Sequence, residues 1–174
     1  MQRNIASLFL QYARLDRKRS LEGLDASETE LLAKLKVYLS STLLPQVPRG
    51  AERRDSIRVP AEFQCRWAPV VRAEEARITT LSRTGAFIRT PTPAPIGEEI
   101  AISIALPAGG RLEVPGSVAN QILGPDPDRR GMGVRFGKLA ADERATIDGL
   151  YEQSIVRHFG SPDEDEKPEL PTSG

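Results

Sequence analysis

The chain has 174 residues, with 24 Lys and Arg against 24 Asp and Glu, one His and one Cys. A single Cys excludes an internal disulfide and a cysteine-based metal site, and a single His removes most catalytic dyads and triads. Hydrophobic residues make up 39% of the chain and aromatic residues 5%, which allows one compact domain with a mainly aliphatic core plus an appendage. We therefore expect a protein that binds no metal and is not an enzyme.

The sequence contains no run of about 18 apolar residues, so no segment is expected to span a membrane. Its first residues lack an apolar stretch that ends in a small-residue cleavage site. We therefore expect a cytoplasmic location.

The neutral total combines segments of different charge. Residues 1–48 carry a net charge of +2, residues 49–90 carry +4, residues 91–160 carry −2 and residues 161–174 carry −4. The basic segment holds nine Arg and no Lys, and guanidinium groups match phosphates and guanine edges. The acidic tail, residues 161–174, is rich in charge and Pro, which is typical of a disordered, solvated segment.

Residues 1–48 predict a helical hairpin. The first helix has one apolar stripe, formed by Ile5, Leu8, Phe9, Tyr12 and Leu15. Asp25 or Ser27 can cap the second helix, and Ser27 and Glu30 have capping-box spacing. Two such helices bury little by themselves, so the stripe needs another surface. Two alternatives remain open: the stripe docks on the main domain, or it mediates self-association as a homodimer through residues 1–48.

Residues 49–58 form an arginine-rich linker. After it, the spacing of apolar residues changes from the helical period of 3.6 residues to the strand period of two. Alternating residues predict strands around residues 63–67, 76–80, 86–88, 100–106, 112–122 and 132–136. Turns are expected at residues 82–85 and 109–110, and a bulge or bend is expected at Pro115-Gly116. A last helix is predicted over Ala141–His158.

Many short strands closed by one helix indicate a mainly β fold. We expect a small six-stranded antiparallel β-barrel with a C-terminal helix over residues 59–160, preceded by the N-terminal helical hairpin. Alternating β/α units are absent from the pattern, which disfavours a doubly wound sheet. Trp67 is expected in the core rather than stacked on a nucleobase.

Two spaced motifs carry the chemistry. Arg54-x-x-x-Arg58 places two guanidinium groups just before a strand, and Arg forks can bind phosphates and the guanine O6/N7 edge. Thr80-x-Ser82-x-x-Gly85 places small hydroxyl residues at a strand end, followed by a glycine free to take positive φ. Residues 131–137 are glycine-rich but alternate like a strand, so we interpret their glycines as relief for tight packing or a bend and not as a phosphate loop.

These motifs resemble the bacterial PilZ domain, from Arg53 to the end of the last helix. The matching segments are Arg53-Arg54-Asp-Ser-Ile-Arg58-Val-Pro60, Leu81-Ser82-Arg-Thr-Gly85-Ala-Phe and Gly131-Met-Gly-Val-Arg-Phe136. The resemblance implies a six-stranded barrel with a C-terminal helix and a receptor for cyclic di-GMP, taken up as one molecule or an intercalated pair. It implies the ligand-binding residues Arg53, Arg54, Arg58, Thr80, Ser82 and Gly85. Among them, Arg54 and Arg58 would hold guanine and phosphates, while Ser82 and Gly85 would shape the corner of the pocket.

The sequence departs from the family pattern at Thr80, where the second motif normally begins with Asp or Asn. Losing one good contact of this type costs about 1–3 kcal/mol, or about 5- to 150-fold in affinity. The leading hypothesis is a cyclic di-GMP effector that signals to a protein partner in motility, polarity or surface behaviour. The alternative is a degenerate PilZ-like adaptor that binds a protein partner without the nucleotide. Nucleic-acid binding is not expected, because the net charge is zero and aromatic residues are few.

Overall fold

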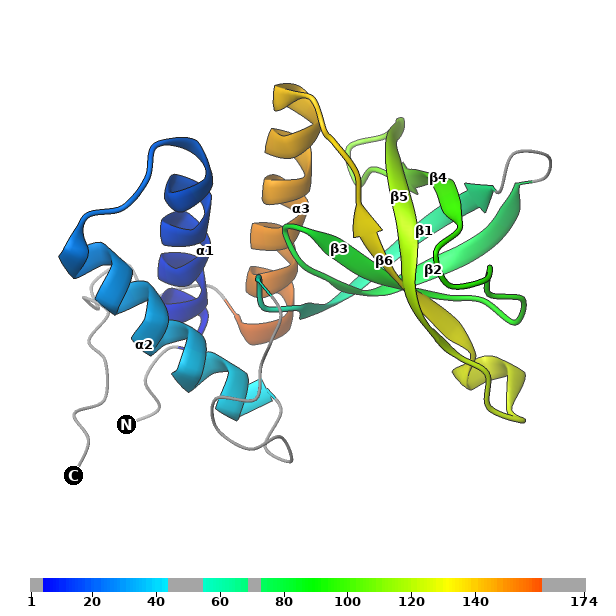
Figure 1. Cartoon of the computed structure of the whole chain (residues 1–174), viewed down its shortest axis with the longest axis horizontal. Coiled ribbons are helices and arrows are strands. Elements are labelled where there is room, and N and C mark those ends of the chain that lie inside the picture. The colour runs from blue at the N-terminus through cyan, green and yellow to red at the C-terminus, as the bar shows by residue number, and fades with distance from the viewer. Residues whose placement is uncertain (1–4, 44–54, 69–72, 161–174) are drawn as a thin grey trace. The chain divides into compact units, whose positions relative to one another are not determined.

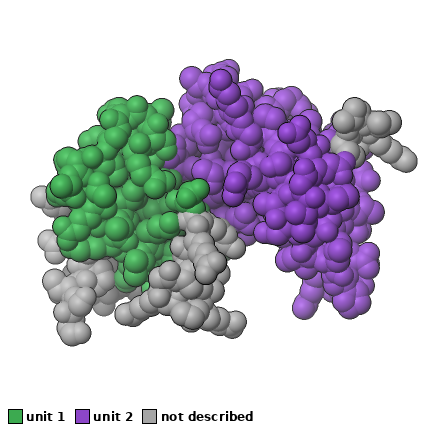
Figure 2. Space-filling view, in the orientation of Figure 1, with its two compact units in different colours: residues 1–57, 155–174 green, residues 58–154 purple. Residues whose placement is uncertain are grey.

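The structure is a computed structural model of the chain, and it describes residues 5–43, 55–68 and 73–160. Two compact units are present: residues 1–57 with residues 155–174, and residues 58–154 (Figure 2). Most of the predicted linker, residues 49–54, and the predicted acidic tail, residues 161–174, lie outside the described residues.

The larger unit is a closed barrel of six antiparallel strands (Figure 1). The strands are β1 (Val59–Ala68), β2 (Glu74–Leu81), β3 (Gly85–Arg89), β4 (Glu99–Ala105), β5 (Arg111–Ile122) and β6 (Gly131–Phe136). They follow the order β1-β2-β3-β6-β5-β4 around the barrel, and a short 3₁₀ helix, η1 (Pro127–Arg129), precedes β6. The predicted fold class is therefore confirmed.

Strand alternation builds the barrel core. In β1 the residues Val59, Phe63, Cys65 and Trp67 are all buried, while the residues between the last three are exposed. Side chains on a strand point alternately to the two faces of the sheet, so the buried side chains of β1 face the interior of the barrel. Trp67 is 3% exposed and belongs to the core, as predicted.

Of the two alternatives expected at Pro115-Gly116, a bulge or a bend, the bulge is wrong in position and the bend stays a prediction. Strand β5 continues through both residues, because the Pro115 carbonyl accepts a hydrogen bond from the Gly137 N–H at 2.8 Å and Gly116 pairs with Phe136. The extra residue lies between Val118 and Asn120 instead. The predicted turn at Gly109 and Gly110 is confirmed, and both glycines have positive φ.

Helix α3 (Ala141–Phe159) follows the barrel. Its buried apolar positions are Ile147, Leu150, Tyr151 and Ile155, which recur at helical spacing. Gly160, with φ of 90°, follows the helix as a left-handed C-terminal residue. The observed bounds differ from the predicted ones by one residue. The boundary between the two units falls within α3, after Ser154.

The smaller unit contains α1 (Ile5–Leu21) and α2 (Ala26–Leu43), the two predicted helices (Figure 1). Phe9 and Tyr12 of the predicted stripe are buried. The Phe9 ring stacks on Phe159 at the end of α3, with ring centroids 4.7 Å apart. Part of the stripe therefore packs on the end of α3 within the smaller unit, and the two alternatives, docking on the main domain and self-association, stay predictions.

Helix α2 begins with a capping box that differs from the predicted one. The Asp25 carboxylate accepts a hydrogen bond from the Glu28 N–H at 2.8 Å, and the Glu28 carboxylate accepts one from the Asp25 N–H at 3.1 Å. Asp25, the first of the two predicted caps, is therefore correct. The expected pairing of Ser27 with Glu30 is wrong, because Glu30 pairs with Lys34 one helical turn later.

Candidate functional site

Four of the six predicted site residues meet at one end of the barrel. Strand β1 pairs with β2 so that Val59 lies opposite Leu81 and Pro60 lies opposite Thr80. Arg58 directly precedes Val59, so it lies where β2 ends and the turn to β3 begins. Arg53 and Arg54 lie outside the described residues. The register thus places Arg58 of the Arg54-x-x-x-Arg58 motif next to the Thr80-x-Ser82-x-x-Gly85 motif.

A β-bulge decides which way Thr80 faces. Ile78 pairs with Ile88, but Thr80 pairs with Phe87, so β2 has one residue more than β3 over this stretch. Ile78 and Leu81 are both buried, whereas Thr80 shares a face with Phe87, the half-buried outward residue of β3. The regular alternation of Ile78 and Thr80 expected from the sequence is therefore wrong. The bulge turns Thr80 to the outer face of the barrel.

Ser82 fixes the turn between β2 and β3. Its N–H donates to the Gly85 carbonyl at 2.8 Å, its hydroxyl donates to the same carbonyl at 3.1 Å, and the Thr84 N–H donates to its hydroxyl at 3.3 Å. Ser82 is 2% exposed, and its hydroxyl forms its hydrogen bonds within the turn. Ser82 therefore holds the backbone of Thr84 and Gly85 in position.

Gly85 is needed because β3 and β6 approach closely there, and the prediction that it takes a positive φ is wrong. Its φ lies outside the positive region, and a Cβ placed there would lie 2.2 Å from the carbonyl oxygen of Val134 on β6. Gly85 pairs with Arg135, and the Phe136 N–H donates to the Thr84 carbonyl at 2.9 Å. Any side chain at this position would separate β3 from β6.

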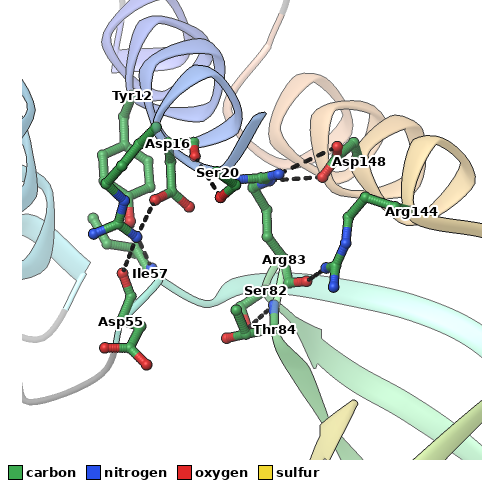
Figure 3. A network of polar contacts seen from close by, with 11 residues as sticks. Tyr12, Asp16, Ser20, Asp55, Ile57, Ser82, Arg83, Thr84, Arg144 and Asp148 are labelled. Carbon is green, nitrogen blue, oxygen red and sulfur yellow. Dashed lines mark hydrogen bonds and ion pairs between the residues drawn. The ribbon is translucent and has the colours of Figure 1, made fainter. Parts of the chain in front are cut away.

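The sequence reasoning missed a buried ion pair behind the turn (Figure 3). The Arg83 Nε donates to Asp148 Oδ1 of α3 at 2.6 Å, and both side chains are 4% exposed. Arg144, also on α3, donates to the Arg83 carbonyl. These contacts fix the Ser82–Gly85 turn to α3. Asp148 lies three residues before the buried Tyr151, so its place on the apolar face of the helix was a signal in the sequence.

Three exposed arginines lie on the outer face of the barrel, on β3 and its two neighbours β2 and β6. Arg89 and Phe87 share that face, and the register adds Arg77 opposite Arg89 and Arg135 opposite Gly85. All three arginines are exposed. Strand alternation and the predicted turn could have placed them, but the sequence reasoning did not single them out.

The glycines of β6 relieve tight packing, as predicted. A Cβ on Gly131 would lie 2.6 Å from the Phe87 ring, and one on Gly133 would lie 2.5 Å from the Asn120 side chain. Asn120 Oδ1 accepts a hydrogen bond from the Gly133 N–H at 3.0 Å. The segment is a strand, which confirms that it is not a phosphate loop.

The next features concern a possible nucleophile, a possible metal site and a possible membrane span in the described residues. Burial raises the pKa of the Cys65 thiol to about 12, so the thiol stays protonated and inert. Within residues 5–43, 55–68 and 73–160, His, Cys, Asp and Glu form no group of three that could hold a metal ion. In the same ranges, no helix is long and apolar enough to cross a membrane. The site offers guanidinium groups, a hydroxyl and backbone groups, all of which can form hydrogen bonds to a ligand.

Comparison with known structures supports the fold. The chain is similar to the inhibitor of motility MotI/DgrA from Bacillus subtilis, with a TM-score of 0.53, 16% sequence identity, and coverage of 64% of this chain and 57% of that chain. It is also similar to MrkH of K. pneumonia in a c-di-GMP complex, with a TM-score of 0.51, 17% identity, and coverage of 62% and 54%. The matched regions span a little over half the length of these two proteins. No curated protein matches the sequence.

The family assignment follows from sequence and fold together. The model of the PilZ domain matches residues 52–153, which contain both motifs, all six strands and most of α3. The closed six-stranded barrel with its C-terminal helix agrees with that match. The chain therefore belongs to the PilZ domain family.

Proposed function

We propose that the chain is a receptor for cyclic di-GMP that transmits the level of this second messenger to a protein partner. The observation that carries the proposal is the register of β1 and β2, which brings Arg58 beside Thr80 and the Ser82–Gly85 turn. Family membership supports it, and so does the similarity to MrkH, whose structure is that of a complex with c-di-GMP.

The binding roles follow from the chemistry of the side chains. Arg58, together with Arg53 and Arg54, would bind phosphate oxygens and the guanine O6/N7 edge through bidentate hydrogen bonds. Thr80 would offer its hydroxyl to the guanine from the outer face of β2. Ser82 and Gly85 would keep the turn compact enough for the ligand to approach the backbone. In this proposal no bond is made or broken, so the proposed role is that of a receptor and not of an enzyme. The proposed location is the cytoplasm.

The proposed output lies in residues 1–48. On binding, the arginines of residues 49–58 would contact the ligand, and these contacts would change how residues 1–48 are presented to a partner. The partner would be a second protein or a second copy of this chain through the same residues. The family implies a role in motility, polarity or surface behaviour.

Thr80 supports a second candidate, an adaptor that binds its partner without nucleotide. A Thr hydroxyl is shorter than the expected carboxylate or amide and supplies a weaker acceptor, and a lost contact of this kind costs about 5- to 150-fold in affinity. For an adaptor, Arg54→Ala and Arg58→Ala leave partner binding intact, whereas removal of residues 1–48 abolishes it.

Calorimetric titration separates the two candidates. Cyclic di-GMP is titrated into the full-length chain and into Arg58→Ala, at low salt and high protein concentration. A receptor gives saturable binding that Arg58→Ala abolishes. Absence of binding to the wild-type chain under these conditions contradicts the receptor proposal and favours the adaptor.

A further inference from the structure

Two arginines face each other on the outer surface of β2 and β3. The register pairs Arg77 with Arg89, and both side chains are exposed. Residues directly opposite on antiparallel strands have Cβ atoms about 4.5–5.5 Å apart, and like charges at this spacing destabilise the pairing. The fold alone therefore gives no reason for two arginines at these positions.

The residues directly opposite these two arginines on their outer neighbouring strands are uncharged. Across the other edges of the two strands, Arg77 pairs with Gln64 of β1 and Arg89 pairs with Gly131 of β6, and neither residue is charged. Glu75 shares the face of Arg77 but is paired with Arg66. Within residues 5–43, 55–68 and 73–160, neither Arg77 nor Arg89 forms an ion pair.

The arginine pair is continuous with the proposed ligand site. Phe87 lies two residues from Arg89 on the same face of β3, which is about 7 Å along a strand, and it pairs with Thr80. The Phe87 ring occupies the space above Gly131, where a side chain would otherwise stand. An apolar ring therefore lies between the two arginines and Thr80.

We infer that Arg77 and Arg89 bind a phosphate group of the dinucleotide, whose other parts extend along Phe87 to Thr80 and Arg58. The inference rests on the proposed function and extends that site by about 7 Å along the outer face of the barrel. Guanidinium groups bind phosphate oxygens bidentately, so an anion placed between two arginines converts their repulsion into attraction. This contact offsets the weaker acceptor at Thr80.

The test compares two variants of the full-length chain in calorimetric titrations with cyclic di-GMP at low and moderate salt. The first is the double variant Arg77→Gln/Arg89→Gln. The second is Arg111→Gln, which removes one exposed arginine of β5 that bonds Ser103 on the β4 side of the barrel. We expect the double variant to bind at least tenfold more weakly and to depend less on salt, and the Arg111 variant to bind like the wild type.

Thermal unfolding without ligand gives an independent readout. Because the substitution removes a like-charge pair, the double variant should unfold at the same temperature as the wild type or at a higher one, even though it binds more weakly. A drop in affinity caused by a damaged fold would instead lower this temperature, and that result would contradict the inference.

The outcomes for this face and for the proposed function are distinct. If the wild type binds, Arg58→Ala abolishes binding and the double variant keeps wild-type affinity, the arginine pair plays no part and the inference is overturned while the receptor proposal stands. If the wild type does not bind at all, the proposed function fails and this inference fails with it.

Discussion

In the proposed receptor, Thr80 is the residue at which the site departs from the family pattern. It is turned outward by the bulge in β2, and its hydroxyl supplies one weak acceptor where a carboxylate or an amide would supply stronger ones. We predict that Thr80→Asp and Thr80→Asn strengthen cyclic di-GMP binding by about 5- to 150-fold in calorimetric titrations. Thr80→Val is the matched control, because it keeps the shape and removes the hydroxyl. Equal affinities for all three variants would show that residue 80 does not contact the ligand.

Gly85 limits the distance between β3 and β6. A methyl group there would meet the Val134 carbonyl oxygen at 2.2 Å, and neither backbone can move without breaking the strand pairing. We predict that Gly85→Ala lowers the free energy of unfolding by at least about 2 kcal/mol in urea denaturation.

Gly149 of α3 is the control for this prediction, because a Cβ there would meet no atom within 4 Å. Gly149→Ala should raise the free energy of unfolding by about 0.5–1 kcal/mol, since alanine is the better helix former. If the two substitutions changed stability alike, the close approach at Gly85 would not limit the barrel.

Among the elements, α3 is held to the β2–β3 turn by the buried pair of Arg83 and Asp148. Removing one partner of a buried ion pair leaves an uncompensated charge and costs about 3–5 kcal/mol, whereas replacing both with apolar residues is often nearly neutral. We predict that Arg83→Met lowers the free energy of unfolding by about that amount and that Arg83→Met/Asp148→Leu recovers most of the loss.

The exposed pair of Arg66 and Glu75 on the barrel surface is the comparison for this measurement. Surface ion pairs contribute about 0–1 kcal/mol, so Arg66→Met should change stability little. A loss in Arg83→Met no larger than that in Arg66→Met would contradict a structural role for the buried pair.

Helix α1 carries a buried phenol that makes its unit sensitive to alkali. Burial raises the pKa of Tyr12 to about 12, its hydroxyl accepts a hydrogen bond from the Ile57 N–H at 3.1 Å, and the nearby Asp16 carboxylate adds to the shift (Figure 3). Below about pH 10 the phenol is neutral in both states, so its contribution to stability is complete. Above that pH the unfolded state ionises first, and the contribution is lost as the pH rises through about 12.

The tyrosinate absorbance at 295 nm measures this shift. The difference between the wild type and Tyr12→Phe isolates the signal of Tyr12 from the other two tyrosines of the chain. We expect this difference to titrate near pH 12. A midpoint near pH 10, the ordinary value for tyrosine, would show that Tyr12 is accessible to solvent in the folded protein.

At the scale of the whole molecule, local patterns in the sequence were sufficient for the elements and the fold class. Within the part of the chain that the structure describes, strand alternation located the six strands and helical spacing located the three α-helices, because these patterns depend on which residues must be buried. Details that depend on distant neighbours were not accessible. The outward direction of Thr80 requires the bulge against Phe87, and the need for glycine at residue 85 comes from Val134, about fifty residues away in the chain.

In the candidate site, too, the local motifs could be predicted, whereas contacts between distant residues could not. The two motifs predicted that Arg58, Thr80, Ser82 and Gly85 belong together, and the β1–β2 register brings them to one end of the barrel. The charges around them were missed, because the pairing of Arg77 with Arg89 and of Arg83 with Asp148 exists only after the strands and α3 are in place.

The proposed function depends on recognition of a guanine dinucleotide by this barrel. The most direct measurement is a paired calorimetric titration of the full-length wild-type chain with cyclic di-GMP and cyclic di-AMP at the same salt concentration. Arginine forks match the O6/N7 edge of guanine, whereas adenine carries an amino group in place of O6. For a guanine-specific receptor we predict saturable binding of cyclic di-GMP and none of cyclic di-AMP. No binding of cyclic di-GMP, or equal binding of both dinucleotides, would contradict it.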